Sequence, residues 1–369
     1  MRCFRFFMDF DRARFQISTF FRSRRYFTRI IAIFFALPIL LAFSDPAQAA
    51  VILLANGGNW DVNDKDETRF ITNDTGSIVD GFRDAYDRWG HLHLRVMDTS
   101  NNIIGTSGIL NGFTLTLDGN RSWNTLTPVV SNQISVSRTL FAPSGTNYMR
   151  YLDRFTNTSA STVRIMAAWG GDLGSDSRTT VAATSSGDLN LSAADQWGVT
   201  FDDDGRSGGT SGVPRDPPVG FVMGDSNLIG LGSQDTNDAN PFDSPWPGAF
   251  PLAGSAEDDL SFIYQFDLNP GQTGSLVYFL SHGLSEVHDQ QDGSPPPAQG
   301  TQIPLITATV AGLFAAPDFS GISAGDMATV KNWSSAPVPE PSTIVLWSVG
   351  AAVVGIRRRV RRRVDATVD

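Results

Sequence analysis

Apolar and polar residues alternate with a period of two through most of the region between residues 50 and 300. Side chains at this spacing share one face of a β-strand, so each run predicts a strand with one buried face. Alternating runs begin at Leu92, Phe113, Ile134, Val163, Trp197 and Phe262. Turn-forming segments such as 118–120 and 143–145 separate the runs, and no helical pattern lies between them, which favours hairpins. We therefore predict an all-β fold, an antiparallel β-sandwich, with a large two-sheet supersandwich as one form of it.

The pattern changes near the end of this region. Ile306, Val310 and Leu313 recur at helical spacing, and Ser323 with Asp326 three positions later resembles a capping box. Residues 301–333 are thus predicted to close the domain with short helices. Before them, residues 202–254 are so rich in Gly, Pro and Asp that we expect loops there.

The N-terminus has the three parts of a secretory signal peptide. Arg residues precede the apolar run 30–43, and the small residues Ala47 and Ala49 follow it. Signal peptidase accepts small side chains at such positions, so the mature chain is expected to begin at Ala50. The run is shorter than the roughly 20 residues of a membrane span. We predict export by the Sec machinery and removal of residues 1–49.

The C-terminus carries a Pro-Glu-Pro triplet, an apolar segment from Thr343 to Ile356 and a basic cluster. The triplet is Pro339, Glu340 and Pro341, and the cluster is Arg357, Arg358, Arg359, Arg361, Arg362 and Arg363. Proline keeps the triplet extended and accessible, and basic residues beside a span stay in the cytoplasm. This order resembles the PEP-CTERM sorting signal. The resemblance implies recognition by an exosortase and transient anchoring in the cytoplasmic membrane through a terminal transmembrane helix.

These features divide the chain into successive parts. They are a signal peptide (1–49), a β-sandwich body (50–300), a helical closing segment (301–333), a linker (334–338), the sorting tail (339–363) and a cytoplasmic end (364–369).

Charge and cysteine content exclude several classes of function. Between residues 51 and 356 the chain has 14 Lys and Arg against 33 Asp and Glu, a net charge of −19. Such a body repels phosphate backbones, so no nucleic-acid partner is expected. The only cysteine is Cys3, so the mature chain is expected to form neither disulfides nor thiolate metal sites.

Candidate sites in the body are few. His91 and His93 share the polar face of one predicted strand, where a metal site and a solvated face are the alternatives, and the solvated face is favoured because no third ligand is apparent. Two acidic loop clusters could bind Ca²⁺ as the one candidate cofactor, or could simply solvate turns. The clusters contain Asp61, Asn63 and Asp66, and Asp235, Asn237 and Asp243. Trp246, in a proline-containing loop, is a candidate platform for stacking on sugars.

No catalytic signature occurs, so an enzyme is not predicted. The sequence favours an exported surface or extracellular-matrix protein with a structural or adhesive role, located at the cell surface, in the outer envelope or outside the cell. A secreted carbohydrate-binding protein, with exopolysaccharide as partner, is the alternative. A glycan-active hydrolase or lyase is the second alternative.

Overall fold

The computed structural model describes most of the predicted body and the segment after it. The described residues are 51–53, 59–66, 74–78, 85–119, 121–174, 179–202, 216–232, 259–284 and 301–334. Antiparallel strands dominate them, which confirms the all-β prediction. The signal peptide and the sorting tail lie outside the described residues.

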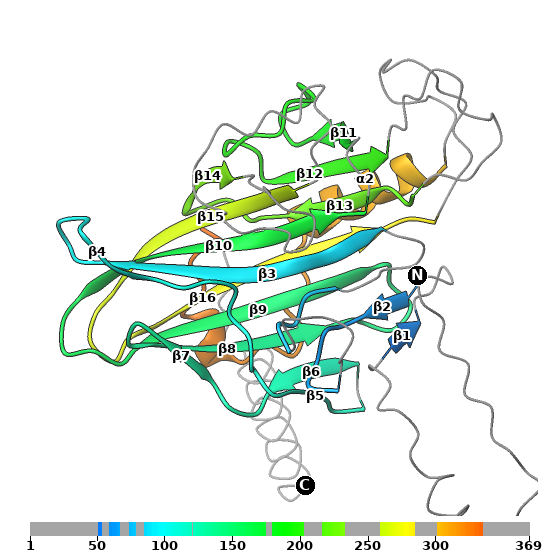
Figure 1. Ribbon diagram of the computed structural model, residues 1–369. Helices are drawn as coiled ribbons and strands as arrows, with labels where there is room; N and C mark the ends of the chain where they lie inside the picture. Colours follow the sequence, from blue (N-terminus) through cyan, green and yellow to red (C-terminus); the bar gives the residue numbers. More distant parts are fainter. Residues whose placement is uncertain are drawn as a thin grey trace, which may run out of the picture. The chain divides into compact units, whose positions relative to one another are not determined.

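One sheet has five strands, and every pairing in it is antiparallel. Its order is β14 (Leu228–Gly232), β15 (Asp259–Leu268), β10 (Val163–Leu173), β3 (Tyr86–Met97) and β4 (Ile103–Thr106). Figure 1 shows β3 and β10 running side by side along this sheet. The strand β4 therefore forms one edge of the sheet and β14 the other.

The second sheet has nine strands. Its order is β11 (Thr179–Thr184), β12 (Trp197–Asp202), β13 (Val219–Val222), β16 (Thr273–His282), β9 (Tyr148–Asn157), β8 (Ile134–Phe141), β6 (Ser122–Thr125) and β5 (Leu115–Leu117), while β7 (Val129–Ser131) also pairs with β8. A separate antiparallel pair joins β1 (Val51–Leu53) to β2 (Asn59–Asp61). The strands β13 and β14 lie in the region where we expected loops, and their short apolar runs were the signal for them.

The two large sheets share one hydrophobic core. The predicted alternation is present on β8, where Ile134, Val136, Arg138 and Leu140 are buried and the residues that alternate with them are partly exposed. Between the sheets, the ring of Trp169 on β10 stacks on the ring of Tyr278 on β16, with 3.9 Å between their centroids. Aromatic side chains bury large apolar areas, so contacts of this kind hold the two layers together.

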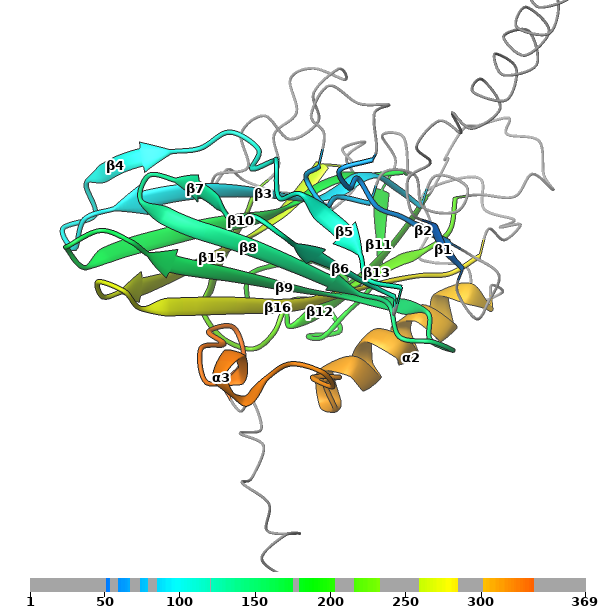
Figure 2. The same cartoon turned by 90° about the horizontal axis from the view of Figure 1, so that it is seen from below.

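A helix covers the outer face of the nine-stranded sheet. α2 (Gln302–Ala315) packs on β12, β13 and β16, and a Cβ at Gly220 would lie only 2.6 Å from Val310 Cγ1. Glycine at this position therefore allows the close approach. Figure 2 shows α2 and α3 (Ala324–Met327) on the same side of the sheet. The amide of Asp326 donates to Ser323 Oγ over 3.1 Å, so the helices and the cap are confirmed.

Candidate functional site

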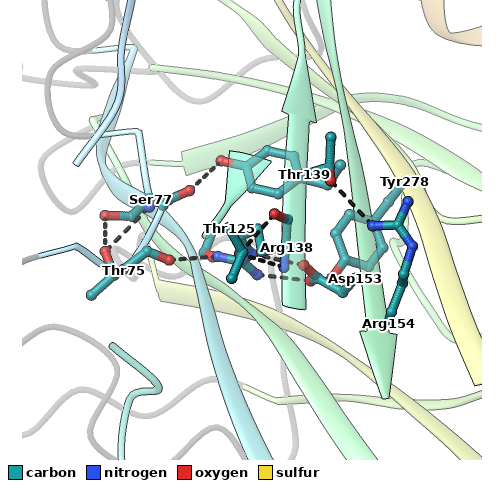
Figure 3. Close-up of polar contacts among 11 residues, drawn as sticks. Thr75, Ser77, Thr125, Arg138, Thr139, Asp153, Arg154 and Tyr278 are labelled. Carbon is teal, nitrogen blue, oxygen red and sulfur yellow. Dashed lines mark hydrogen bonds and ion pairs between the residues drawn. The ribbon is translucent and has the colours of Figure 1, made fainter. Parts of the chain in front are cut away.

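The core contains a buried ion pair that the periodicity analysis did not single out. Arg138 on β8 and Asp153 on β9 are both fully buried and form two hydrogen bonds of 2.8 Å, one from Nε and one from Nη2. The Tyr278 hydroxyl also donates to Asp153. Figure 3 shows these side chains meeting between the strands. A charged residue at an inward position of an alternating strand was the sequence signal for this pair.

Arg138 also donates hydrogen bonds to backbone carbonyl groups in two other segments. Its Nη1 donates to the carbonyl oxygens of Thr75, at 2.8 Å, and Gly90, at 2.6 Å. Burial alone would lower the pKa of Arg138, but the carboxylate of Asp153 overcomes this and raises the pKa above its ordinary value. The guanidinium thus stays charged and connects residues 74–78 to both sheets. Since no atom of the pair reaches solvent, its role is to fix the fold.

A second polar group lies on the outer face of the five-stranded sheet. His91 and His93 lie on this face of β3, and Asp259 and Ser261 lie on the same face of β15. All four are buried, with His91 3% exposed and His93 2% exposed, so the expectation of a solvated face was wrong. The same face also holds the apolar side chains of Met97 and Ile263, which pack together with Met166 and Ala168 of β10.

The environment of His91 keeps its imidazole neutral. Burial lowers the pKa of His91 well below its ordinary value, and the nearby charges of His93, Arg138 and Arg88 lower it further. Its Nδ1 is buried and has no hydrogen-bond partner among the described residues. Imidazole, hydroxyl and carboxylate groups offer both donors and acceptors, and the hydroxyl of Ser261 donates to the carbonyl oxygen of Gly232 over 3.1 Å.

The end of the described chain is fastened to the nine-stranded sheet by residues 329–334, here called the terminal strap. Its Val330 pairs in parallel with Ser275 at the start of β16. The buried side chain of Asn332 donates to Met223 O, at 2.9 Å, and to Val277 O, at 2.6 Å. Asn332 Oδ1 also accepts a hydrogen bond of 2.9 Å from the Val277 amide.

The last residues of the terminal strap extend this attachment. Trp333 Nε1 donates to Val277 O over 2.8 Å, and its ring stacks on Phe314 of α2. The Ser334 hydroxyl donates to the Asp225 carboxylate over 2.6 Å. Sequence analysis placed the linker from residue 334 onward, and ordered contacts continue to that residue.

The described acidic cluster uses its oxygens within the chain. Asn63 Oδ1 accepts from the backbone amide of Asp74, at 2.5 Å, and Asp66 forms an ion pair of 2.8 Å with Lys65. Asp61 is largely buried. No group of three His, Cys, Asp or Glu side chains that could hold a metal occurs in the described part of the chain. Asp235, Asn237 and Asp243 lie outside that part, and Ca²⁺ binding stays a prediction.

Tryptophan side chains in the described ranges serve packing. Trp60, Trp89, Trp123 and Trp169 are fully buried, and Trp333 is 6% exposed. Trp197 is partly buried beside the core under α2. Trp246, the candidate sugar platform, lies outside the described residues, as do the cleavage residues Ala47, Ala49 and Ala50. An aromatic platform therefore stays a prediction.

The fold defines the class of protein as an antiparallel β body made of two packed sheets. Residues 337–363 match the family model of the PEP-CTERM protein-sorting motif, which confirms the resemblance seen at the C-terminus. This motif implies an exported protein that is sorted by an exosortase. The match covers the tail and leaves the body without a named family. No described helix is long and apolar enough to cross a membrane, and the expected sorting helix lies outside the described ranges.

Similarity to other proteins is distant. No curated protein sequence matches the chain. Among solved structures, a polysaccharide lyase has a TM-score of 0.34 and 11% identity, over 65% of this chain and 33% of that chain. An α-galactosidase from Geobacillus stearothermophilus has a TM-score of 0.29 and 9% identity, over 52% and 30% of the two chains. A heparan sulfate lyase from Pedobacter heparinus has a TM-score of 0.27 and 11% identity, over 52% and 24%. The matched region therefore spans a third or less of each of these proteins.

Proposed function

We propose that this protein is a structural or adhesive component of the cell surface or extracellular matrix, delivered there through its sorting tail. The observation that carries the proposal is the sorting motif at residues 337–363, placed directly after a folded β body. The body supports a structural role because its buried groups are used for packing and for fixing backbone, as at Arg138 and Asp153.

The terminal strap supports the same proposal. Pro339 follows Ser334 by five positions, so the connecting chain can span at most about 18 Å. The fold therefore continues almost to the motif, and the body is held close to the membrane while the tail is inserted. Processing beyond Ser334 leaves every contact of the terminal strap in place.

Localisation in cells with and without the exosortase tests the proposal. In wild-type cells we expect the protein at the surface or outside the cell, with a C-terminus shortened within the tail. Replacing Pro339, Glu340 and Pro341 by Ala, or deleting Arg357–Arg363, should cause misprocessing or release. The matched control replaces Pro295, Pro296 and Pro297 by Ala, outside the motif, and should leave sorting unchanged. Normal localisation and an unchanged mass in both tail variants would refute the proposal.

Carbohydrate binding is the second candidate, favoured by Trp246, which lies between two prolines in a loop-like part of the sequence. Aromatic faces stack on sugar rings, and the prolines beside Trp246 keep its loop out of regular strands. Exopolysaccharide from the same cells is the ligand to test first. Such a ligand would suit an adhesive protein of the matrix.

Affinity electrophoresis with soluble polysaccharides tests this candidate. Retention should fall in Trp246→Ala, while the control Ser137→Ala, on the polar side of β8, should match wild type. Retention without new reducing ends indicates binding, and release of reducing ends indicates a glycan-active enzyme. Retention equal in all three proteins, or absent from wild type, contradicts a sugar site at Trp246.

A further inference from the structure

The most exposed large apolar side chains of the described residues lie close together in sequence. Leu126 is 67% exposed, Val130 66%, Ile103 58% and Ile104 55%, and every other one is 46% exposed or less. Single exposed apolar residues are common on protein surfaces, but a group of them marks an interaction site. We call these four residues the aliphatic edge.

Ile103 and Ile104 lie on β4 and Val130 lies on β7, and each of these two strands is an edge strand. β4 has one partner among the described strands, β3, and β7 has one, β8. A side chain at Gly105 of β4 would collide with Oδ1 of Asn132, in the turn after β7, so the two sheet edges touch here. Figure 2 shows β4 and β7 at the same end of the sandwich. An edge strand presents unpaired backbone groups on which another strand can add.

The aliphatic edge lies in a stretch almost free of charge. Residues 99–137 contain one acidic residue, Asp118, and one basic residue, Arg121, in a body with 33 acidic and 14 basic residues. Exposed edge strands usually carry charged side chains, Lys above all, that prevent pairing with another copy. β4 and β7 carry no charged side chain.

We propose that the aliphatic edge is the contact through which two copies of this chain associate, with β4 of one copy beside β4 of the other. This inference rests on the proposed structural role and names its partner. Two bodies of net charge −19 repel each other, and a contact restricted to the neutral stretch places the least charge at the interface. Two antiparallel copies of one edge form a closed, two-fold symmetric pair.

Other occupants fit this edge less well. A sugar would need an aromatic face or convergent polar groups, and the exposed side chains here are aliphatic. An anionic membrane surface attracts clusters of Lys and Arg, and the stretch around the edge holds one Arg. A second copy brings an edge of the same length, the same neutrality and the same apolar side chains.

The absence of cysteine from the expected mature chain allows a direct test by crosslinking. In a Cys3→Ser background, Ile103→Cys and Ile104→Cys each place one thiol on β4, and export permits disulfide formation. Leu305→Cys on α2 is the matched control, since Leu305 is also an exposed aliphatic residue. We expect a reducible dimer band on gels of surface protein from at least one β4 variant and none from the control.

Self-association of the exported, processed protein gives a second readout by sedimentation. Ile104→Lys should weaken dimer formation at least about tenfold, because Lys side chains facing each other across antiparallel strands repel. Leu305→Lys should associate like wild type. A wild-type protein that stays monomeric up to about 100 μM, or equal crosslinking of the β4 and control cysteines, would overturn the proposal. Failure of the proposed sorting would instead appear as normal localisation and an unchanged mass of the tail variants.

Discussion

Removing the charge of Asp153 tests the most tightly buried polar contact of the fold. Asp153→Asn keeps the size of the side chain but leaves the guanidinium of Arg138 charged and fully buried without a carboxylate. Breaking a buried ion pair from one side costs about 3–5 kcal/mol of unfolding free energy. Since a domain is stable by only about 5–15 kcal/mol, this single change should remove a large share of the total.

An exposed pair of the same kind provides the control. Arg164 and Asp267 form an ion pair of 2.7 Å, but the side chain of Asp267 is 49% exposed. Exposed pairs contribute about 0.2–1 kcal/mol, so Asp267→Asn should cost less than about 1 kcal/mol.

Urea denaturation of both variants, followed by far-UV circular dichroism, measures the two costs. A double variant, Arg138→Met with Asp153→Leu, removes both charges and also leaves the carbonyl groups of Thr75 and Gly90 without their donor. The difference in unfolding free energy between this variant and Asp153→Asn therefore compares one unpaired buried charge with two unpaired carbonyl groups. Equal and small losses of unfolding free energy for Asp153→Asn and Asp267→Asn would refute the reasoning, because burial would then have no influence on the cost of breaking an ion pair.

Three further predictions follow from buried groups and from the ends of the chain. Burial lowers the pKa of His91 and His282, so the unfolded chain takes up protons first as the pH falls, and stability should drop between about pH 7.5 and 5.5, by at most about 1.4 kcal/mol for each and more for His91 than for His282. His91→Gln should remove the part of this loss of stability that comes from His91, as measured by urea titrations at both pH values. A loss equal to that of the wild type would contradict this. Asn332→Ala leaves the buried amide of Val277 unpaired and takes one of two donors from the carbonyl oxygens of Val277 and Met223, so it should cost about 1–3 kcal/mol, whereas exposed Asn190→Ala should cost almost nothing. N-terminal sequencing of the exported protein should begin at Ala50, and retention of Phe43 would exclude cleavage there.

The sequence predicted those parts of the fold that repeat a local pattern. Period-two alternation located β3, β8, β10 and β15, and helical spacing located α2. The continuous apolar run of β16 was less informative, because it reflects burial on both faces, by the core and by α2 with the terminal strap. Short β13 and β14 went unrecognised because their few residues lie among Gly- and Asp-rich segments.

The candidate sites were less predictable because they depend on contacts between distant residues. Arg138 and Asp153 are 15 positions apart, and Arg138 meets Thr75 from 63 positions away. Alternation correctly placed His91 and His93 on the outer face, but it could not show that this face is buried. The tail was predictable because its three parts are contiguous in sequence.

The terminal strap has a mechanical consequence for a protein held at a surface by its C-terminus. Force applied beyond Ser334 reaches the body first through the hydrogen bonds of Ser334 to Asp225 and then through those of Asn332 and Trp333 to Val277 on β16. β16 lies inside the nine-stranded sheet, between β13 and β9, and not at its edge. The strap runs parallel to β16, so a pull along the strands loads several hydrogen bonds at once. Tension applied through the C-terminus is therefore distributed into the middle of the sheet.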